Sequence, residues 1–239
     1  MSGFPGGTAV SIVTVYDWPT VDDQAGGSPH LHTASTEGYV VTRGAGAVET
    51  LSAAGFERRE LRRGTVLWFT PGTVHRLINV SGDLEVTVVM QNAGLPEAGD
   101  AVLTYPAGVL ADPEAYAAAT GAPAAAGLGD DERAAAARRR RDLAIEGYLE
   151  LRERVRAEGP EAMKPLWTTA ASLVSGRVDT WRALWAEGPK AQVETTGRHI
   201  EALAGADATH LCDAHVSEAG DPDRRWGMCG RLEAFDLRP

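Results

Sequence analysis

Three histidines and one glutamate are the residues of this chain whose types and spacing could do chemistry. His30 and His32 are separated by a single residue, Glu37 follows shortly after them, and His75 lies further along the chain. Imidazole nitrogens and a carboxylate oxygen form a ligand set that first-row divalent metals accept. These four residues therefore indicate a metal site.

Short strands and turns would have to bring these side chains together. Because alternate residues of a strand face the same side, His30 and His32 can point one way while the residue between them points the other. Glu37 lies an odd number of residues from both, so a turn must return it on a neighbouring strand. Pro71-Gly72 is a turn signal, and the strand that begins after it would carry His75 on the metal-facing side.

The first stretch resembles the first signature motif of the cupin superfamily. That motif is Gly-x5-His-x-His-x3–4-Glu-x6-Gly, and this chain matches it from His30 to Gly44. Gln24 stands where the leading glycine is expected, with Gly26 and Gly27 just after it. A motif match of this kind is a hypothesis that its structural context must support.

The second stretch resembles the second cupin motif, Gly-x5-Pro-x-Gly-x2-His-x3-Asn. Gly64, Gly72, His75 and Asn79 match it, whereas Thr70 stands in place of the proline, which comes one position later. Neither this departure nor the one in the first motif affects a candidate metal ligand.

The resemblance implies a fold, a ligand set and a cofactor. Cupins are small β-barrels of the jelly-roll type, and the similarity extends over about residues 8–105. The metal ligands would be His30, His32, Glu37 and His75, and the cofactor would be one divalent transition metal per chain: iron, manganese, nickel or zinc. No second His-x-His motif occurs in the sequence, so the resemblance is to single-motif cupins.

Composition limits the other classes of function. The chain has 239 residues, enough for one large domain or two small ones, and its net charge is −10. This charge argues against a broad nucleic-acid-binding surface and against binding to an anionic membrane. The sequence shows no signal peptide and no membrane-spanning apolar run, so we predict a cytoplasmic protein with reduced thiols at Cys212 and Cys229.

The sequence pattern divides the chain into three parts. Residues 1–110 contain short β-prone runs between turn signals and predict the cupin barrel. Residues 111–206 predict a helical extension, and residues 207–239 predict a hairpin that packs on the barrel or on a partner. The expected fold class is mainly β: a jelly-roll β-barrel followed by an α-helical C-terminal region and a terminal β-hairpin. The expected strands are residues 9–16, 39–42, 47–51, 65–69, 74–79 and 84–91, the expected helices are about 113–120, 130–158, 163–185 and 190–205, and the expected hairpin strands are 209–216 and 226–237.

Two groups on the predicted helices have alternative interpretations. Arg138–Arg141 could form a nucleic-acid-binding patch, but consecutive residues point around a helix, so we predict a solvated, ion-paired helix. Trp167, Trp181 and Trp185 could line a ligand pocket. They follow the apolar stripe of their helix, which favours a helix core or a subunit interface.

The C-terminal histidines and cysteines also have two interpretations. His210, Cys212, His215 and Cys229 could form a second metal site, although their spacing matches no standard zinc pattern. A hairpin that turns symmetrically about residues 220 and 221 would place Cys212 opposite Cys229. A disulfide is then geometrically possible but not expected in the cytosol.

The expected function is that of a metal-dependent enzyme. Four protein ligands leave up to two adjacent positions on an octahedral ion, which suits two substrate oxygens, or one substrate oxygen and dioxygen. We predict a dioxygenase-type oxidoreductase that acts on a small organic molecule, one of the activities that the resemblance to cupins implies. The alternatives are a sugar or keto-acid isomerase or epimerase, and a non-enzymatic small-molecule sensor or binding protein.

Strand facing also suggests which residues line the pocket, and sheet edges suggest a partner. The strand predicted over residues 84–91 carries one apolar face, and other residues point to the same side of their strands as the candidate ligands. The candidate lining residues are Tyr39, Leu77, Asn79, Val86, Val88 and Met90. Apolar helices and an uncovered sheet edge predict a homodimer. The sequence does not identify a catalytic acid or base.

Overall fold

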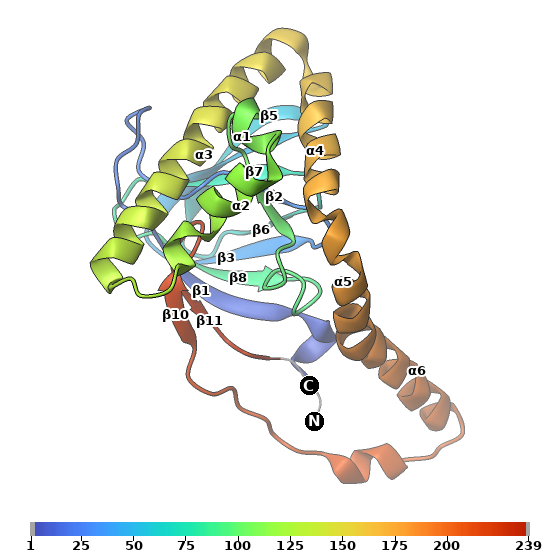
Figure 1. Cartoon of the computed structure of the whole chain (residues 1–239). Coiled ribbons are helices and arrows are strands. Elements are labelled where there is room, and N and C mark those ends of the chain that lie inside the picture. Colours follow the sequence, from blue (N-terminus) through green and yellow to red (C-terminus); the bar gives the residue numbers. More distant parts are fainter. Residues whose placement is uncertain (1–2, 238–239) are drawn as a thin grey trace.

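Two antiparallel sheets form the body of the protein (Figure 1), and the computed structural model describes residues 3–237. One sheet has six strands in the order β10-β11-β1-β8-β3-β6, and the other has five in the order β5-β4-β7-β2-β9. This is the predicted jelly-roll-like arrangement. The strands are β1 (Ala9–Val15), β2 (His30–His32), β3 (Glu37–Arg43), β4 (Ala45–Ser52), β5 (Gly55–Arg62), β6 (Val66–Phe69), β7 (Val74–Asn79), β8 (Glu85–Met90), β9 (Ala101–Leu103), β10 (Asp223–Trp226) and β11 (Gly230–Ala234).

Side-chain alternation places the barrel core between the two sheets. Val86, Val88 and Met90 of β8 are buried, while the residues between them are only partly buried. They belong to one apolar cluster with Val13 of β1 and Leu77 of β7. Every residue of β7 is buried, because the helices cover the outer face of its sheet. The predicted apolar face of the strand over residues 84–91 is thereby confirmed.

Helices follow the barrel strands, and all but the last of them contribute side chains to the apolar cluster on the outer face of the five-stranded sheet. They are α1 (Ala107–Leu110), α2 (Pro113–Gly121), α3 (Asp130–Glu158), α4 (Lys164–Val174), α5 (Val178–Trp185) and α6 (Ala191–Ala204). The sequence predicted a break at Gly188-Pro189. Instead, a π-helical turn, Ala186–Lys190, connects α5 to α6 in one nearly continuous helical run (Figure 1). No helix in the described part of the chain is both long and apolar enough to cross a membrane.

The three tryptophans of α4 and α5 differ in their surroundings. Trp181 is buried in the cluster between the helices and the five-stranded sheet, and its Nε1 donates to the Ala98 carbonyl at 3.1 Å. Trp167 is partly buried and donates to the Gly72 carbonyl at 2.8 Å. Trp185 is 46% exposed. The helix-core interpretation is therefore confirmed for Trp181.

Helix α3 lies directly against the chain that leaves β9. A Cβ atom added at Gly147 would lie 2.3 Å from the carbonyl oxygen of Thr104 and 2.4 Å from the carbonyl carbon of Tyr105. Thr104 Oγ1 also donates to the Ala144 carbonyl at 2.9 Å. Only glycine permits this approach of helix backbone to barrel backbone.

The arginine run of α3 is not uniformly solvated. Arg138 and Arg139 are exposed, Arg140 is partly buried and Arg141 is fully buried. The Arg141 guanidinium donates to the two backbone carbonyls of Trp18-Pro19 at 2.6 and 3.1 Å. The prediction of a solvated helix is therefore wrong for the last two arginines, because four consecutive residues span the helix circumference and one side of α3 faces the barrel.

The terminal hairpin lies later in the chain than predicted. Residues 209–213 form a 3₁₀ turn, and residues 211–221 are all exposed, so the predicted strand over 209–216 has no sheet or core to pack against. The hairpin pairs β10 with β11, and β11 pairs with β1 of the same chain. Cys212 is exposed, Cys229 is buried, and both are free, so no disulfide joins them.

Candidate metal centre

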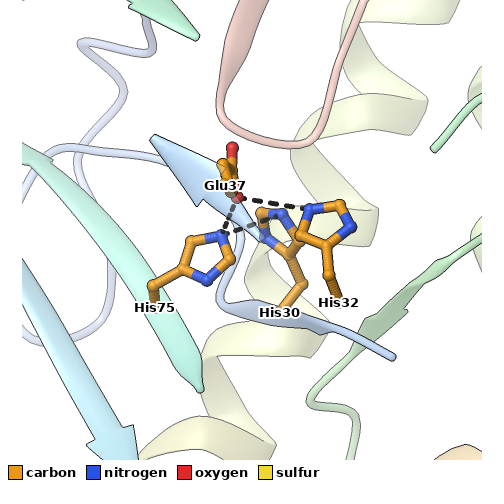
Figure 2. Close-up of side chains that lie close together, drawn as sticks. All are labelled: His30, His32, Glu37 and His75. Atoms are coloured by element: carbon orange, nitrogen blue, oxygen red, sulfur yellow. Dashed lines mark hydrogen bonds and ion pairs between the residues drawn. The ribbon is translucent and has the colours of Figure 1, made fainter. Parts of the chain in front are cut away.

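The four candidate ligands come together inside the barrel (Figure 2). β2 carries His30 and His32, and its pairing with β7 sets His30 opposite His75. Glu37 is the first residue of β3, which belongs to the other sheet. The sequence had suggested a strand directly beside β2. One ligand atom from each of the four lies within 4.8 Å of the others, and all four side chains are buried.

The ligand atoms face one another at short distances. Glu37 Oε2 lies 2.9 Å from His75 Nε2 and 3.2 Å from His32 Nε2. The Nε2 atoms of His30 and His75 are 3.1 Å apart. Three imidazoles thus present the same ring atom to one carboxylate oxygen.

Contacts of the other ring nitrogen explain why Nε2 points inward. His30 Nδ1 lies 2.9 Å from the Ser28 carbonyl oxygen, and His75 Nδ1 lies 3.2 Å from that of Thr73. Because a carbonyl oxygen only accepts, each Nδ1 carries the proton and each Nε2 keeps its lone pair. Glu37 Oε2 is buried and has no hydrogen-bond donor among the described residues. Converging lone pairs repel unless a cation lies between them, so the donor set fits a metal ion.

Asp100 orients the third imidazole together with the turn that follows it. Its Oδ2 lies 3.4 Å from His32 Nδ1 and accepts from the Ser35 N–H at 3.0 Å. Its Oδ1 accepts from the N–H groups of Thr33 and Ala34 at 2.8 and 2.7 Å. One buried carboxylate therefore fixes a ring and the backbone that leads to the carboxylate ligand. Sequence reasoning missed Asp100, because it is distant along the chain and belongs to neither motif.

Burial and mutual charge set the protonation of the cluster. Burial lowers the pKa of His30 well below its usual value, and the neighbouring His75 and His32 lower it further. Burial also lowers the pKa of His32, but Glu37 and Asp100 outweigh this effect and raise the pKa to about 9. For Glu37, burial raises the pKa, and His75 and His32 outweigh it to hold the pKa well below its usual value. Because ligands bind in their deprotonated forms, metal binding would displace the proton of His32.

A cavity of about 540 Å³ opens beside the cluster. His30, His32 and Glu37 line it, and so do Val88 and Met90 of β8, which the sequence suggested as pocket residues. Apolar side chains thus form one wall next to the candidate ligands.

The other suggested lining residues, Tyr39, Leu77, Asn79 and Val86, are buried and do not line this cavity. Tyr39 packs edge-on against Phe69, with ring centroids 5.1 Å apart. The Asn79 side chain supports a turn, since its Oδ1 accepts from the N–H groups of Gly82 and Leu84 at 2.9 and 3.1 Å. Side-chain alternation along the strands predicted which face of the sheet these residues are on, but not how deeply they are buried in the barrel.

Segments far from both motifs complete the cavity wall. Met228 and Cys229 come from the turn of the terminal hairpin, Arg140 from α3 and Tyr116 from α2. Burial raises the pKa of Cys229, and the nearby Glu37 raises it further, which keeps the thiol protonated. Sequence analysis singled out Cys229 only for other sites, and it noted the arginine run without identifying the inward side of that run.

The alternative second metal site is not assembled. Cys229 is buried, whereas Cys212 and His215 are in the exposed segment before β10. His210 stacks on His199 of α6, with ring centroids 4.3 Å apart. Within residues 3–237, the barrel cluster is the only group of three or more potential ligands that lie close enough to share an ion.

Comparison with known proteins agrees with this architecture. Residues 20–91 match the family model of the cupin domain, and these residues include all four candidate ligands. The barrel is a cupin domain. No curated protein is significantly similar to the chain in sequence.

Several solved structures resemble the cupin domain in fold. A double-stranded β-helix protein from Klebsiella pneumoniae is 16% identical over 36% of this chain and 69% of its own, with a TM-score of 0.30. A TDP-fucose-3,4-ketoisomerase from Campylobacter jejuni is 15% identical over 38% of this chain and 64% of its own, with a TM-score of 0.32. An oxalate oxidase in complex with glycolate is 22% identical over 38% of this chain and 54% of its own, with a TM-score of 0.27.

Proposed function

We propose that the cupin domain holds one divalent transition metal ion through His30, His32, Glu37 and His75. The supporting observation is the convergence of three Nε2 atoms and one carboxylate oxygen within 4.8 Å in a buried site. Asp100 and two backbone carbonyls hold the opposite ring nitrogens, and such outer contacts orient metal-binding histidines. A bound ion would supply Lewis acidity and, if iron, manganese or nickel, redox chemistry to substrate oxygens.

We further propose that the protein is a metal-dependent oxidoreductase of the dioxygenase type that acts on a small organic molecule. The cavity of about 540 Å³ reaches three of the four ligands, which leaves the metal accessible from one side. Its volume lies within the range of about 300–1,000 Å³ that is common for small-molecule sites. Val13, Val88 and Met90 line this cavity and would keep water from the reacting atoms.

Metal content tests the first proposal. Chelator-treated protein would be reloaded separately with iron, manganese, nickel and zinc, and the bound metal measured by mass spectrometry. We expect about one ion per chain in the wild type and a large loss in His75→Ala. His215→Ala is the control, because this side chain is exposed and outside the barrel. A His75→Ala protein that retains a full equivalent would contradict the proposed site.

Oxygen consumption over a panel of diketones, flavonoids and catechols tests the reaction class. We expect uptake by wild-type protein loaded with iron, manganese or nickel, and none by His75→Ala. Turnover that persists without dioxygen would contradict an oxygenase and indicate isomerisation. Binding of a compound without turnover, with every metal loaded, would indicate a sensor.

A further inference from the structure

Arg140 brings a positive charge from the helical extension to the metal-facing cavity. It extends from α3 and lines the same cavity as His30, His32 and Glu37. Its neighbour Arg139 is exposed on the same helix. A charged side chain is therefore directed toward the space that a substrate would occupy.

The guanidinium of Arg140 lacks a counter-charge. Its Nη2 donates to the Gly227 carbonyl at 2.5 Å and to the Trp226 carbonyl at 3.4 Å, while its buried Nε has no acceptor among the described residues. No carboxylate in residues 3–237 forms an ion pair with it. Burial lowers the pKa of Arg140, and the nearby Tyr16, Tyr105 and Cys229 oppose this effect, so the guanidinium keeps its charge at neutral pH.

A purely structural role does not account for this arrangement. Tyr16 Oη already donates to the Gly227 carbonyl at 2.7 Å, so Arg140 is not needed to satisfy that oxygen. A buried donor without a partner destabilises the fold, and more so when it is charged. Arg140 differs from the two fully buried arginines in lacking a carboxylate partner: Arg76, whose Nε also has no acceptor, pairs with Asp22, and Arg141 pairs with Asp142.

Two further arginines of the cavity lining also lack an ion-pair partner among the described residues. Arg133 and Arg177 also line the cavity, and neither forms an ion pair with a described residue. Each donates only to backbone carbonyls, at 3.0 Å for Arg133 and 3.2 Å for Arg177. The lining also contains the carboxylates of Glu37, Glu97, Asp130 and Asp223, so the attraction for an anion depends on arginines without an ion-pair partner and not on a single sign of charge along the cleft.

We propose that Arg140 binds the carboxylate of an organic acid whose other end meets the metal centre. The proposal rests on the proposed function and names its substrate class: a small organic acid with an apolar body. The apolar body would contact Val13, Val88 and Met90, and the carboxylate would accept from the part of the Arg140 guanidinium that lines the cavity. A hydrogen bond to a charged group contributes about 1.5–3 kcal/mol, so Arg140 should favour an acid over its amide by about 10- to 100-fold.

Calorimetric titration with 3-phenylpropionate and 3-phenylpropionamide tests this preference, because the two probes share a shape and differ in charge. Both are titrated into wild-type protein, metal-free and zinc-loaded, and into Arg140→Gln and Arg139→Gln. We expect the acid to bind about tenfold or more tightly than the amide in wild type and in the Arg139→Gln control. The preference should fall to about threefold or less in Arg140→Gln. Equal binding of both probes to wild type, or an unchanged preference in Arg140→Gln, would overturn the inference.

The metal-free titration separates this inference from the proposed function. A wild-type protein that takes up no metal but keeps the acid preference, lost in Arg140→Gln, would contradict the metal site and support Arg140. If Arg140→Gln fails to fold, a crystal structure of metal-free wild type with 3-phenylpropionate decides. A carboxylate within hydrogen-bond distance of the Arg140 guanidinium supports the inference, and a carboxylate bound elsewhere overturns it.

Discussion

Replacing Asp100 with asparagine tests whether a residue outside both motifs holds the metal centre together. In the wild type, Oδ1 accepts from Thr33 and Ala34 N–H groups, and Oδ2 accepts from Ser35 N–H and faces His32 Nδ1. Asparagine can keep an oxygen in the place of Oδ1. Its NH₂ group would then stand in the place of Oδ2 and face two donors, Ser35 N–H and His32 Nδ1, so both of these contacts are lost.

The size of the effect follows from these two contacts. Removing the outer partner of a metal-binding histidine typically lowers metal affinity by about 10- to 100-fold. This corresponds to about 1.4–2.8 kcal/mol, which is also the range for one charge-assisted hydrogen bond. We therefore expect Asp100→Asn to bind zinc about 10- to 100-fold more weakly than wild type at pH 7.

Competition with a chromophoric zinc chelator measures this affinity. Asp83→Asn is the matched control, because the Asp83 side chain is 56% exposed in a turn and accepts from Ser81 Oγ at 2.6 Å, away from the candidate ligands. We expect the control to bind zinc as wild type does. If Asp100→Asn retains wild-type affinity while folded, the argument that Asp100 orients His32 and its turn is refuted.

Three further predictions concern packing, charge and metal. Gly147→Ala should lower the free energy of unfolding by about 1–3 kcal/mol, because the added methyl group meets backbone atoms, although alanine favours a helix by about 1 kcal/mol. Gly197→Ala in α6, where no atom lies within 4 Å of the added Cβ, should raise the free energy of unfolding by about 1 kcal/mol. Asp22→Asn should cost about 3 kcal/mol at pH 7, since it leaves the fully buried Arg76 unpaired. Burial raises the pKa of Asp22, but Arg76 outweighs it and holds the pKa at about 2, so wild type should lose this advantage as the pH falls from about 4 to about 2. Zinc at 100 times its dissociation constant should stabilise wild type by about 2.7 kcal/mol and leave His75→Ala unchanged.

Thermal and denaturant unfolding measure all three predictions. A Gly147→Ala protein that is more stable than wild type would contradict the close packing of α3 on the barrel. An Asp22→Asn deficit of the same size at pH 7 and pH 2 would exclude the Arg76 pair as its cause. Equal stabilisation of wild type and His75→Ala by zinc would place the metal elsewhere.

Local pattern predicted most of the barrel strands and the four side chains that come together as candidate ligands. Alternation over residues 84–91 marks a half-buried strand, and the His-x-His spacing places two rings on one face of β2. β5 was missed because charged residues interrupt its pattern, and β9 because three residues carry too little signal. The homodimer, the cytoplasmic location and the domain boundaries stay predictions.

The terminal hairpin shows why local pattern has limits. Residues 209–216 resemble a strand in composition, but a strand requires a partner or an apolar surface, and this segment has neither. The strand that forms is β11, since β1 offers it an unpaired edge. Sequence composition could not show which edge was free.

By itself, the sequence determined which atoms can bind a metal, because ligand chemistry and strand parity are properties of neighbouring residues. Only the tertiary structure decided that Asp100 holds His32, that Arg140 faces the cavity while Arg139 faces solvent, and that the hairpin turn closes the cavity wall. These features join segments that are far apart in the chain. Their positions depend on how helices and sheets pack. The spacing of residue types along a single strand or helix does not encode this packing.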